Sequence, residues 1–202
     1  MARPPKINDE ELLEIALECF LEHGANVSAQ VIADRVGLSQ PALFKRFGTK
    51  KELFLRAVLP PEHLPILDWL SERPVPGPFR PQMVEMLEQL WGTLSWVLPR
   101  VQLLQAARIP RAEAFGRYDT APPQRLIMAI TGFFQRAMQH GHLRSGVKPK
   151  LTAFQVFGAL MARRFQHDMM PPSEEGESDA AFLATTADTL CFGIAADPTS
   201  TP

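Results

Sequence analysis

The sequence predicts an all-α protein, and two observations support that prediction. Apolar residues recur at the i, i+3 and i+4 spacing of amphipathic helices through most of the 202 residues. β-branched residues are sparse, and the strict alternation of apolar and polar residues that marks half-buried strands is absent. We expect an N-terminal domain of short helices in residues 1–58 and a larger helical domain in residues 59–202.

Composition places the chain among globular proteins. It is 46% hydrophobic and 21% charged, which allows a sizeable core. No apolar run reaches the roughly 18–20 residues that span a bilayer, and the N-terminal stretch has no apolar signal region. Cys19 and Cys191 each lie within an apolar helical pattern, so we expect free thiols and a cytoplasmic location. The net charge of -1 gives no indication of a polyanionic partner, and only local charge is informative.

The first two helices have start and stop residues that the sequence makes visible. Asn8 precedes an apolar pattern and Glu11 stands three residues on, so a capping box is predicted at the helix start. Gly24 is expected to end this helix. Ser28 is expected to cap a short second helix, and Gly37 allows the left-handed turn that ends it.

Two more short helices are predicted to follow. Ser39 is expected to cap a helix over residues 40–47, where Pro41 is tolerated because its missing N–H would be unpaired in the first turn. Gly48 is expected to end that helix. The run Thr49–Glu52 then predicts a capping box at the start of a fourth helix.

The C-terminal part is predicted to consist of longer helices. Seven prolines between Pro60 and Pro81 indicate a boundary before it. Pro99 is expected to kink or restart a helix, and residues 109–121 and 170–177 are expected to be loops. The predicted helices cover residues 81–98, 100–108, 122–140, 150–167 and 178–195.

The second and third predicted helices, joined by a glycine turn, have the layout of a helix-turn-helix. At 100° per residue, Leu43 and Phe47 share the inward face of the third helix. Gln40, Ala42 and Lys45 then lie on its outer face or at its exposed N-terminal end, where such helices meet base edges. Their side chains suit an adenine edge, a thymine methyl group and a guanine or phosphate, respectively.

Cations gather around this helix in a chain that is almost neutral. Within residues 36–54 the cations are Lys45, Arg46, Lys50 and Lys51, and the first acid of this stretch is Glu52. Lysine in the first turn of a helix opposes the helix dipole, which makes sense if an anion also docks there. Lys50 is therefore predicted to bind phosphate at a helix start. The alternative is that Lys50 and Lys51 are solvated surface lysines.

One run of short motifs extends over the four N-terminal helices. It consists of Ile32-Ala33, Gly37-Leu38-Ser39, Ala42-Leu43-Phe44, Phe47 and Lys50, followed by Glu52-Leu53. With these motifs, residues 8–58 resemble the N-terminal domain of TetR-type transcription regulators. Three positions depart from the family pattern: Phe44 replaces the common tyrosine, Pro41 replaces a small residue, and the link from Gly24 to Ile32 is one residue short.

The resemblance implies a helix-turn-helix that binds double-stranded DNA at a near-palindromic operator, most often as a repressor. It also implies a homodimer and a small-molecule effector, for which an apolar or amphipathic compound is expected. The residues expected to contact DNA are Ser28, Ser39, Gln40, Pro41, Ala42, Phe44, Lys45, Arg46 and Lys50.

The last two helices are expected to form the dimer interface that the resemblance implies. Independently, Gly158 and Ala162 form a small-xxx-small step, and Gly193 lies on the apolar stripe of the last helix, so partner helices have room to approach. The alternative is that these stripes pack within one subunit. The predicted interface residues are Phe154, Gly158, Met161, Ala162, Phe165, Phe182, Thr186, Leu190 and Gly193.

A stripe of methionine and aromatic residues is predicted to line an effector pocket. Methionine adapts to varied ligands, although such a stripe is equally typical of an ordinary core. The candidate residues are Met86, Leu90, Trp91, Leu94, Met128, Phe133, Phe134 and Met138.

The sequence gives no sign of an enzyme. It has no glycine-rich phosphate loop, no nucleophile elbow and no zinc-type cysteine spacing. His140 and His142 are two residues apart, but spacing places no third ligand beside them. We therefore expect no catalytic residue, metal or cofactor. The alternatives are a helical protein-interaction module and a small all-α enzyme without a recognisable motif.

Overall fold

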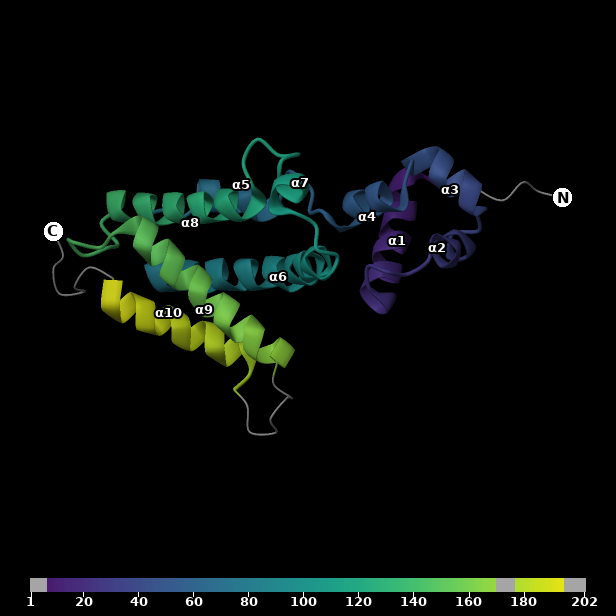
Figure 1. The fold of residues 1–202 in the computed structure, drawn as a ribbon. Coiled ribbons are helices and arrows are strands. Elements are labelled where there is room, and N and C mark those ends of the chain that lie inside the picture. The colour runs from purple at the N-terminus through teal and green to yellow at the C-terminus, as the bar shows by residue number, and fades with distance from the viewer. Residues whose placement is uncertain (1–6, 170–176, 195–202) are drawn as a thin grey trace. The chain divides into compact units, whose positions relative to one another are not determined.

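The computed structural model describes residues 7–169 and 177–194 (Figure 1). Within these ranges the chain is helical and contains no strand, which confirms the predicted fold class. The helices are α1 (Asp9–His23), α2 (Ala29–Arg35), α3 (Gln40–Phe47), α4 (Lys50–Val58), α5 (Pro65–Glu72), α6 (Phe79–Ala106), α7 (Arg111–Phe115), α8 (Pro122–Gln139), α9 (Pro149–Met169) and α10 (Asp179–Ile194).

The helices form two compact units that do not follow chain order. The first unit comprises Met1–Pro61 and Trp96–Asp119, and the second comprises Glu62–Ser95 and Thr120–Pro202. Helix α6 therefore begins in the second unit and ends in the first. The expected division into a domain of residues 1–58 and a domain of residues 59–202 stays a prediction. The compact unit that contains the N-terminal helices also contains residues 96–119.

The short N-terminal helices begin at the capping residues that the sequence indicates. At α1, the Glu11 N–H donates to Asn8 Oδ1 over 2.8 Å and the Asn8 N–H donates to Glu11 Oε2 over 3.2 Å, which confirms the capping box. At α4, Thr49 Oγ1 accepts from the Glu52 N–H over 3.1 Å. The reciprocal half is absent because the Glu52 carboxylate accepts from Arg117 instead.

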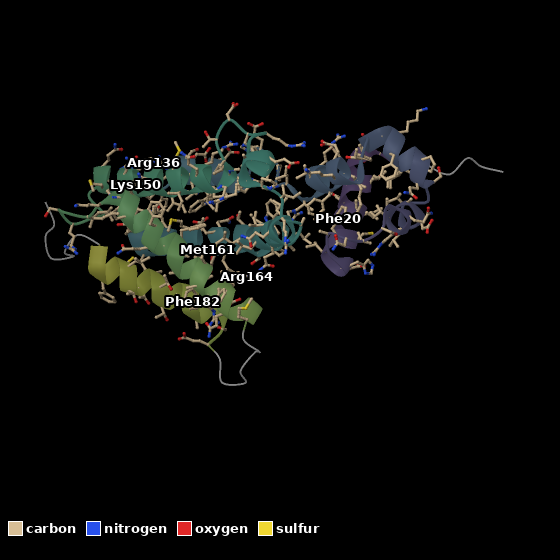
Figure 2. The ribbon with its side chains drawn as sticks, in the orientation of Figure 1. Phe20, Arg136, Lys150, Met161, Arg164 and Phe182 are labelled. Carbon is tan, nitrogen blue, oxygen red and sulfur yellow. The ribbon has the colours of Figure 1, made fainter. Side chains whose placement is uncertain are left out.

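The core of the first unit is built from all of its helices. Phe20 is fully buried and meets Phe54 edge to face with a centroid distance of 4.9 Å (Figure 2). Leu103 and Leu104 from the end of α6 and Ala114 from α7 are buried in the same cluster. The helix-turn-helix thus depends for part of its core on residues that lie far along the chain.

The second unit is organised around α8, which packs against α5 and α9. Its apolar face is buried through Leu126, Ile130, Phe133 and Phe134. Arg136 on α8 donates to the carbonyl oxygens of Leu70 and Arg73 at the end of α5 (Figure 2). These carbonyls have no intrahelical partner, so the guanidinium supplies the missing donors. Burial of this side chain lowers the pKa of Arg136.

Proline positions explain where the predicted helices and the structure differ. Pro99 lies inside α6, so one helix replaces the two that the sequence predicts. Helix α5 has Pro65 in its first turn, and Pro110 is the N-cap of α7. Proline fits a first turn because no intrahelical donor is needed there. The expectation that residues 109–121 form a loop is therefore wrong for α7. Residues 170–176 lie outside the described residues.

No helix in the described ranges is long and apolar enough to cross a lipid bilayer.

Candidate functional site

The turn between α2 and α3 has a geometry that glycine favours. Gly37 has a φ of 69°, in the left-handed region. Around it the Leu38 N–H donates to the Ala33 carbonyl over 2.9 Å and the Gly37 N–H donates to the Asp34 carbonyl over 3.2 Å. These bonds close the end of α2 and turn the chain into α3.

One face of α3 packs against the core of the first unit. Leu43 is fully buried and Phe47 is 3% exposed, so both anchor the helix in the core of the first unit. Phe44 is partly buried and packs against the same core cluster. Ser39 Oγ accepts from the Ala42 N–H over 3.3 Å and caps the helix. The remaining face is available to a partner.

That remaining face carries the residues that were predicted to read bases. Pro41 and Lys45 are exposed, and Gln40 and Ala42 are partly exposed. Gln40 and Lys45 supply an amide and a cation beside the small Ala42 side chain. An amide and a cation at the accessible face of a helix are the groups that recognise purine edges in a major groove.

Arg46 has contacts within the protein. Its Nη2 donates to the Ile7 carbonyl over 2.8 Å and lies 3.2 Å from Asp9 Oδ1. The side chain is 25% exposed. Arg46 therefore ties α3 to the start of α1, and a DNA contact through its guanidinium would compete with these bonds.

The three charged residues at the start of α4, Lys50, Lys51 and Glu52, differ in their contacts. Lys51 Nζ lies 2.6 Å from Glu113 Oε1 on α7. Glu52 accepts two hydrogen bonds from Arg117, of 2.9 and 2.8 Å, and these hold the pKa of Glu52 below its ordinary value. Lys50 has no carboxylate partner among the described residues. Of the two lysines, Lys50 is therefore the one free to meet a phosphate.

A second ion-pair group joins α1 to α2. Arg35 donates to Glu22 through Nη1 over 2.5 Å and through Nη2 over 3.0 Å. These hydrogen bonds lower the pKa of Glu22 and raise the pKa of Arg35.

Ser28, which was predicted to contact DNA, is exposed, and its Oγ accepts from the Val31 N–H over 3.3 Å at the α2 start.

Sequence reasoning missed the contribution of α7 and of the end of α6. Glu113 and Arg117 pair with residues of the first turn of α4, and Arg108 lies just after the end of α6 with a φ of 53°. The sequence signal available was the alternation of charge between Arg111, Glu113 and Arg117. That alternation does not identify α4 as the partner, because Arg117 and Glu52 lie 65 positions apart in the sequence.

A second candidate surface lies on α9, which has apolar residues on two opposite faces. Thr152, Ala153, Val156 and Leu160 are buried within the second unit. On the other side, Leu151, Phe154, Phe165 and Met169 are between 51% and 65% exposed. We refer to these four residues, with Gly158 and Ala162 between them, as the α9 stripe. At 100° per residue the stripe spans an arc of roughly 80°.

Helix α10 contributes the other residues predicted for an interface. Phe182, Thr186 and Leu190 are partly exposed, as is Met161 on α9, and Gly193 is exposed. Figure 2 labels Phe182 and Met161. Asp179 fixes the start of α10 to α9 by accepting from His167 Nε2 over 2.8 Å and from Arg163. The assignment of these residues to a dimer interface stays a prediction, and their exposure leaves this surface open to a partner.

The residues predicted to line an effector pocket divide into two groups. Met86, Leu90, Phe133 and Phe134 are fully buried and Leu94 is 2% exposed, so they fill the core of the second unit. Trp91 is partly exposed and its ring lies 5.7 Å from that of His167. Met128 and Met138 are 61% and 40% exposed and lie on the outer side of α8. Any pocket at this place therefore has to open within a filled core.

Among the described residues, the two histidines at the end of α8 have no third possible ligand grouped with them. His140 and His142 have ring centroids 5.9 Å apart, and His142 stacks on Phe79. Across the described ranges, no group of three or more possible ligands is arranged to hold a metal ion.

The helix-turn-helix segment matches a known protein family. Residues 12–57, which run from α1 to α4, match the family described as bacterial regulatory proteins, tetR family. No curated protein sequence matches the chain.

Solved structures match over nearly the whole chain. A putative TetR-family transcriptional regulator from Mesorhizobium loti MAFF303099 is 19% identical, with a TM-score of 0.72 over 93% of this chain and 96% of that chain. SmeT, the repressor of the Stenotrophomonas maltophilia multidrug efflux pump SmeDEF, is 20% identical, with a TM-score of 0.61 over 98% and 95%. FadR from Bacillus subtilis, in complex with stearoyl-CoA, is 12% identical, with a TM-score of 0.62 over 91% and 97%. At these identities the likeness shows the fold.

Proposed function

We propose that this chain, which carries the N-terminal domain of the tetR family in residues 12–57, is a repressor that binds DNA as a homodimer and responds to a small molecule. The observation that carries the proposal is the free face of α3. Leu43 and Phe47 anchor the helix, while Gln40 and Lys45 remain accessible for base edges.

The α9 stripe supports the homodimer. In a symmetric dimer the same patch of both protomers meets itself, and small residues such as Gly158 and Ala162 let the helices approach closely. A two-fold axis presents two copies of α3, and a near-palindromic operator presents two half-sites about 34–36 Å apart. We propose that the operator has this symmetry, and that the protein acts in the cytoplasm, where it meets DNA.

The proposed effector is an apolar or amphipathic small molecule. SmeT is known as a complex with triclosan, and FadR as a complex with stearoyl-CoA. In this chain the corresponding proposal places the effector among Met86, Leu90, Phe133 and Phe134. Because these side chains are buried, the effector has to select a form in which the core opens. It releases the operator only as far as it prefers that form over the DNA-binding form.

The test is binding of the full chain to a labelled duplex from the DNA that flanks its own coding region, followed by fluorescence anisotropy over a range of salt. We expect Gln40→Ala to relax sequence preference at one base position, at a cost of about 1–3 kcal/mol for the preferred base. Lys50→Ala should weaken binding to all sequences and lower the salt slope by about one. Lys150→Ala, a change at an exposed lysine on α9, is the matched control (Figure 2).

The two alternative functions give different results in the same assay. A protein-interaction module or an enzyme without phosphate contacts has no steep loss of DNA affinity with salt. Sequence-independent binding with identical behaviour of Gln40→Ala and Lys150→Ala would remove the base-reading role of α3. Absence of duplex binding at low salt would remove the proposed function itself.

A further inference from the structure

An open cavity lies within the first unit beside the start of α4. Its volume is about 470 Å³. Phe54 and Ile109 form its apolar part, and Asn26, Lys50, Lys51 and Arg108 supply its polar part. Asn26, Lys51 and Arg108 are exposed, so this polar part faces solvent.

The cavity carries positive charge that the described acidic residues compensate only in part. Lys51 is paired with Glu113 at 2.6 Å. Lys50 and Arg108 make no ion pair with a carboxylate in the part of the chain that the structure describes. Two cations at one cavity repel each other unless an anion lies between them, so this site favours an anionic ligand.

The backbone holds Arg108 in a conformation that arginine seldom adopts. Its φ of 53° lies in the left-handed region, at the position after a helix where glycine is usual. The Arg108 N–H donates to the Gln105 carbonyl over 2.9 Å, and the Ile109 N–H donates to the Leu104 carbonyl over 3.1 Å. Leu104 is itself buried in the core cluster. The base of the Arg108 side chain is therefore fixed beside the cavity.

We propose that Arg108 and Lys50 together bind one phosphate group of the DNA backbone at this cavity. The inference rests on the proposed DNA-binding function and adds a contact from the end of α6 to those of the helix-turn-helix. Lys50 follows the end of α3 by three residues, so a duplex bound at α3 passes close to it. An open site suits a phosphate that stays attached to a large duplex, whereas small ligands are mostly enclosed. Arginine adds a two-pronged contact that matches phosphate oxygens.

The test compares the full-length chain with Arg108→Gly and Arg108→Lys on a labelled 30-base-pair duplex of arbitrary sequence, from 50 to 200 mM salt. Glycine favours the left-handed turn, so Arg108→Gly should keep or raise the melting temperature. We expect its DNA affinity to fall about eightfold at 0.1 M salt, and its salt slope to fall by about 0.9, the value for one phosphate contact. Arg108→Lys should retain most of the slope, because the charge remains.

Arg111→Ala is the matched control, since Arg111 is an exposed cation at the start of α7 outside the cavity. Equal losses for Arg108→Gly and Arg111→Ala would overturn the inference, because net charge alone would explain them. An unchanged salt slope in Arg108→Gly together with a reduced salt slope in Lys50→Ala would also overturn it, while leaving the proposed function intact.

Titration with pyrophosphate distinguishes binding of a free phosphorylated ligand from binding of the DNA backbone. If Arg108→Gly abolishes pyrophosphate binding without weakening DNA binding, the cavity belongs to a small phosphorylated molecule. No duplex binding by the unmodified chain would instead refute the proposed function.

Discussion

Replacement of Phe165 by alanine is expected to weaken the proposed homodimer strongly. Phe165 lies on the α9 stripe and is 65% exposed in the single chain. A phenylalanine buries on the order of 200 Å² when covered, so roughly 130 Å² of this residue is open to a partner. At about 25 cal/mol per Å², full coverage corresponds to about 3 kcal/mol for each protomer.

A symmetric dimer contains two copies of Phe165, which sets an upper bound of about 6 kcal/mol. If the partner covers half of the open surface, the loss is about 3 kcal/mol, or roughly a hundredfold increase in the dimer Kd. Because the ring is mostly exposed, the unfolding of the monomer should hardly change.

Sedimentation velocity over a concentration series measures the dimer Kd directly. Met128→Ala is the matched control, since Met128 is 61% exposed in the same unit but lies outside the α9 stripe. We expect this control to leave the Kd unchanged. An unmodified chain that sediments as a monomer at micromolar concentration, or equal effects of Phe165→Ala and Met128→Ala, would refute the assignment of the interface to this stripe.

Three further predictions concern the first unit. Gly37→Ala should lower the free energy of unfolding, measured by urea titration, by about 1–2 kcal/mol. The cause is the left-handed backbone alone, since a Cβ at Gly37 meets no atom within 4 Å. A loss no larger than that of the control Gly92→Ala, inside α6, would contradict this prediction. Glu52→Gln should make stability depend less on pH in the acid range. Arg117 lowers the pKa of Glu52, so the pair stabilises the fold at pH values above the ordinary pKa of 4.5. This stabilisation is lost as the pH falls through the lowered pKa. The expected difference, at most about 1 kcal/mol for an exposed pair, is read from melting temperatures between pH 3 and 7, and parallel curves would count against it. Leu104→Ala should cost about 2–5 kcal/mol and lower the melting temperature, whereas a neutral result would show that the end of α6 does not belong to this core.

The N-terminal helices are the part of the fold that the sequence predicts best. Local signals decide them, because Asn8, Ser28, Ser39 and Thr49 cap helices through bonds to residues only three positions away. Gly37 likewise determines its turn through its own backbone. Such features need no knowledge of the rest of the chain, so a single sequence suffices.

Features that depend on distant residues were not predictable in the same way. Pro65 and Pro110 lie at helix starts, although prolines in a sequence are equally compatible with a loop. Lys51 and Lys50 are neighbours of the same type, and only Glu113 on α7 distinguishes their roles. Arg46 was a DNA candidate by its helical position, and its contacts with Ile7 and Asp9 appear only when α1 and α3 are placed together.

The end of α6 also affects how this protein can be divided and recombined. A DNA-recognition module excised at residue 57, where the match to the tetR family ends, lacks Leu103, Leu104 and Ala114 of its own core. A chimera that joins residues 1–57 to the C-terminal part of another regulator has to obtain equivalent side chains from the recipient. Such grafts should succeed only with recipients whose corresponding helix presents leucine-sized residues at these places, and otherwise need residues 96–119 to be carried across with the N-terminal segment.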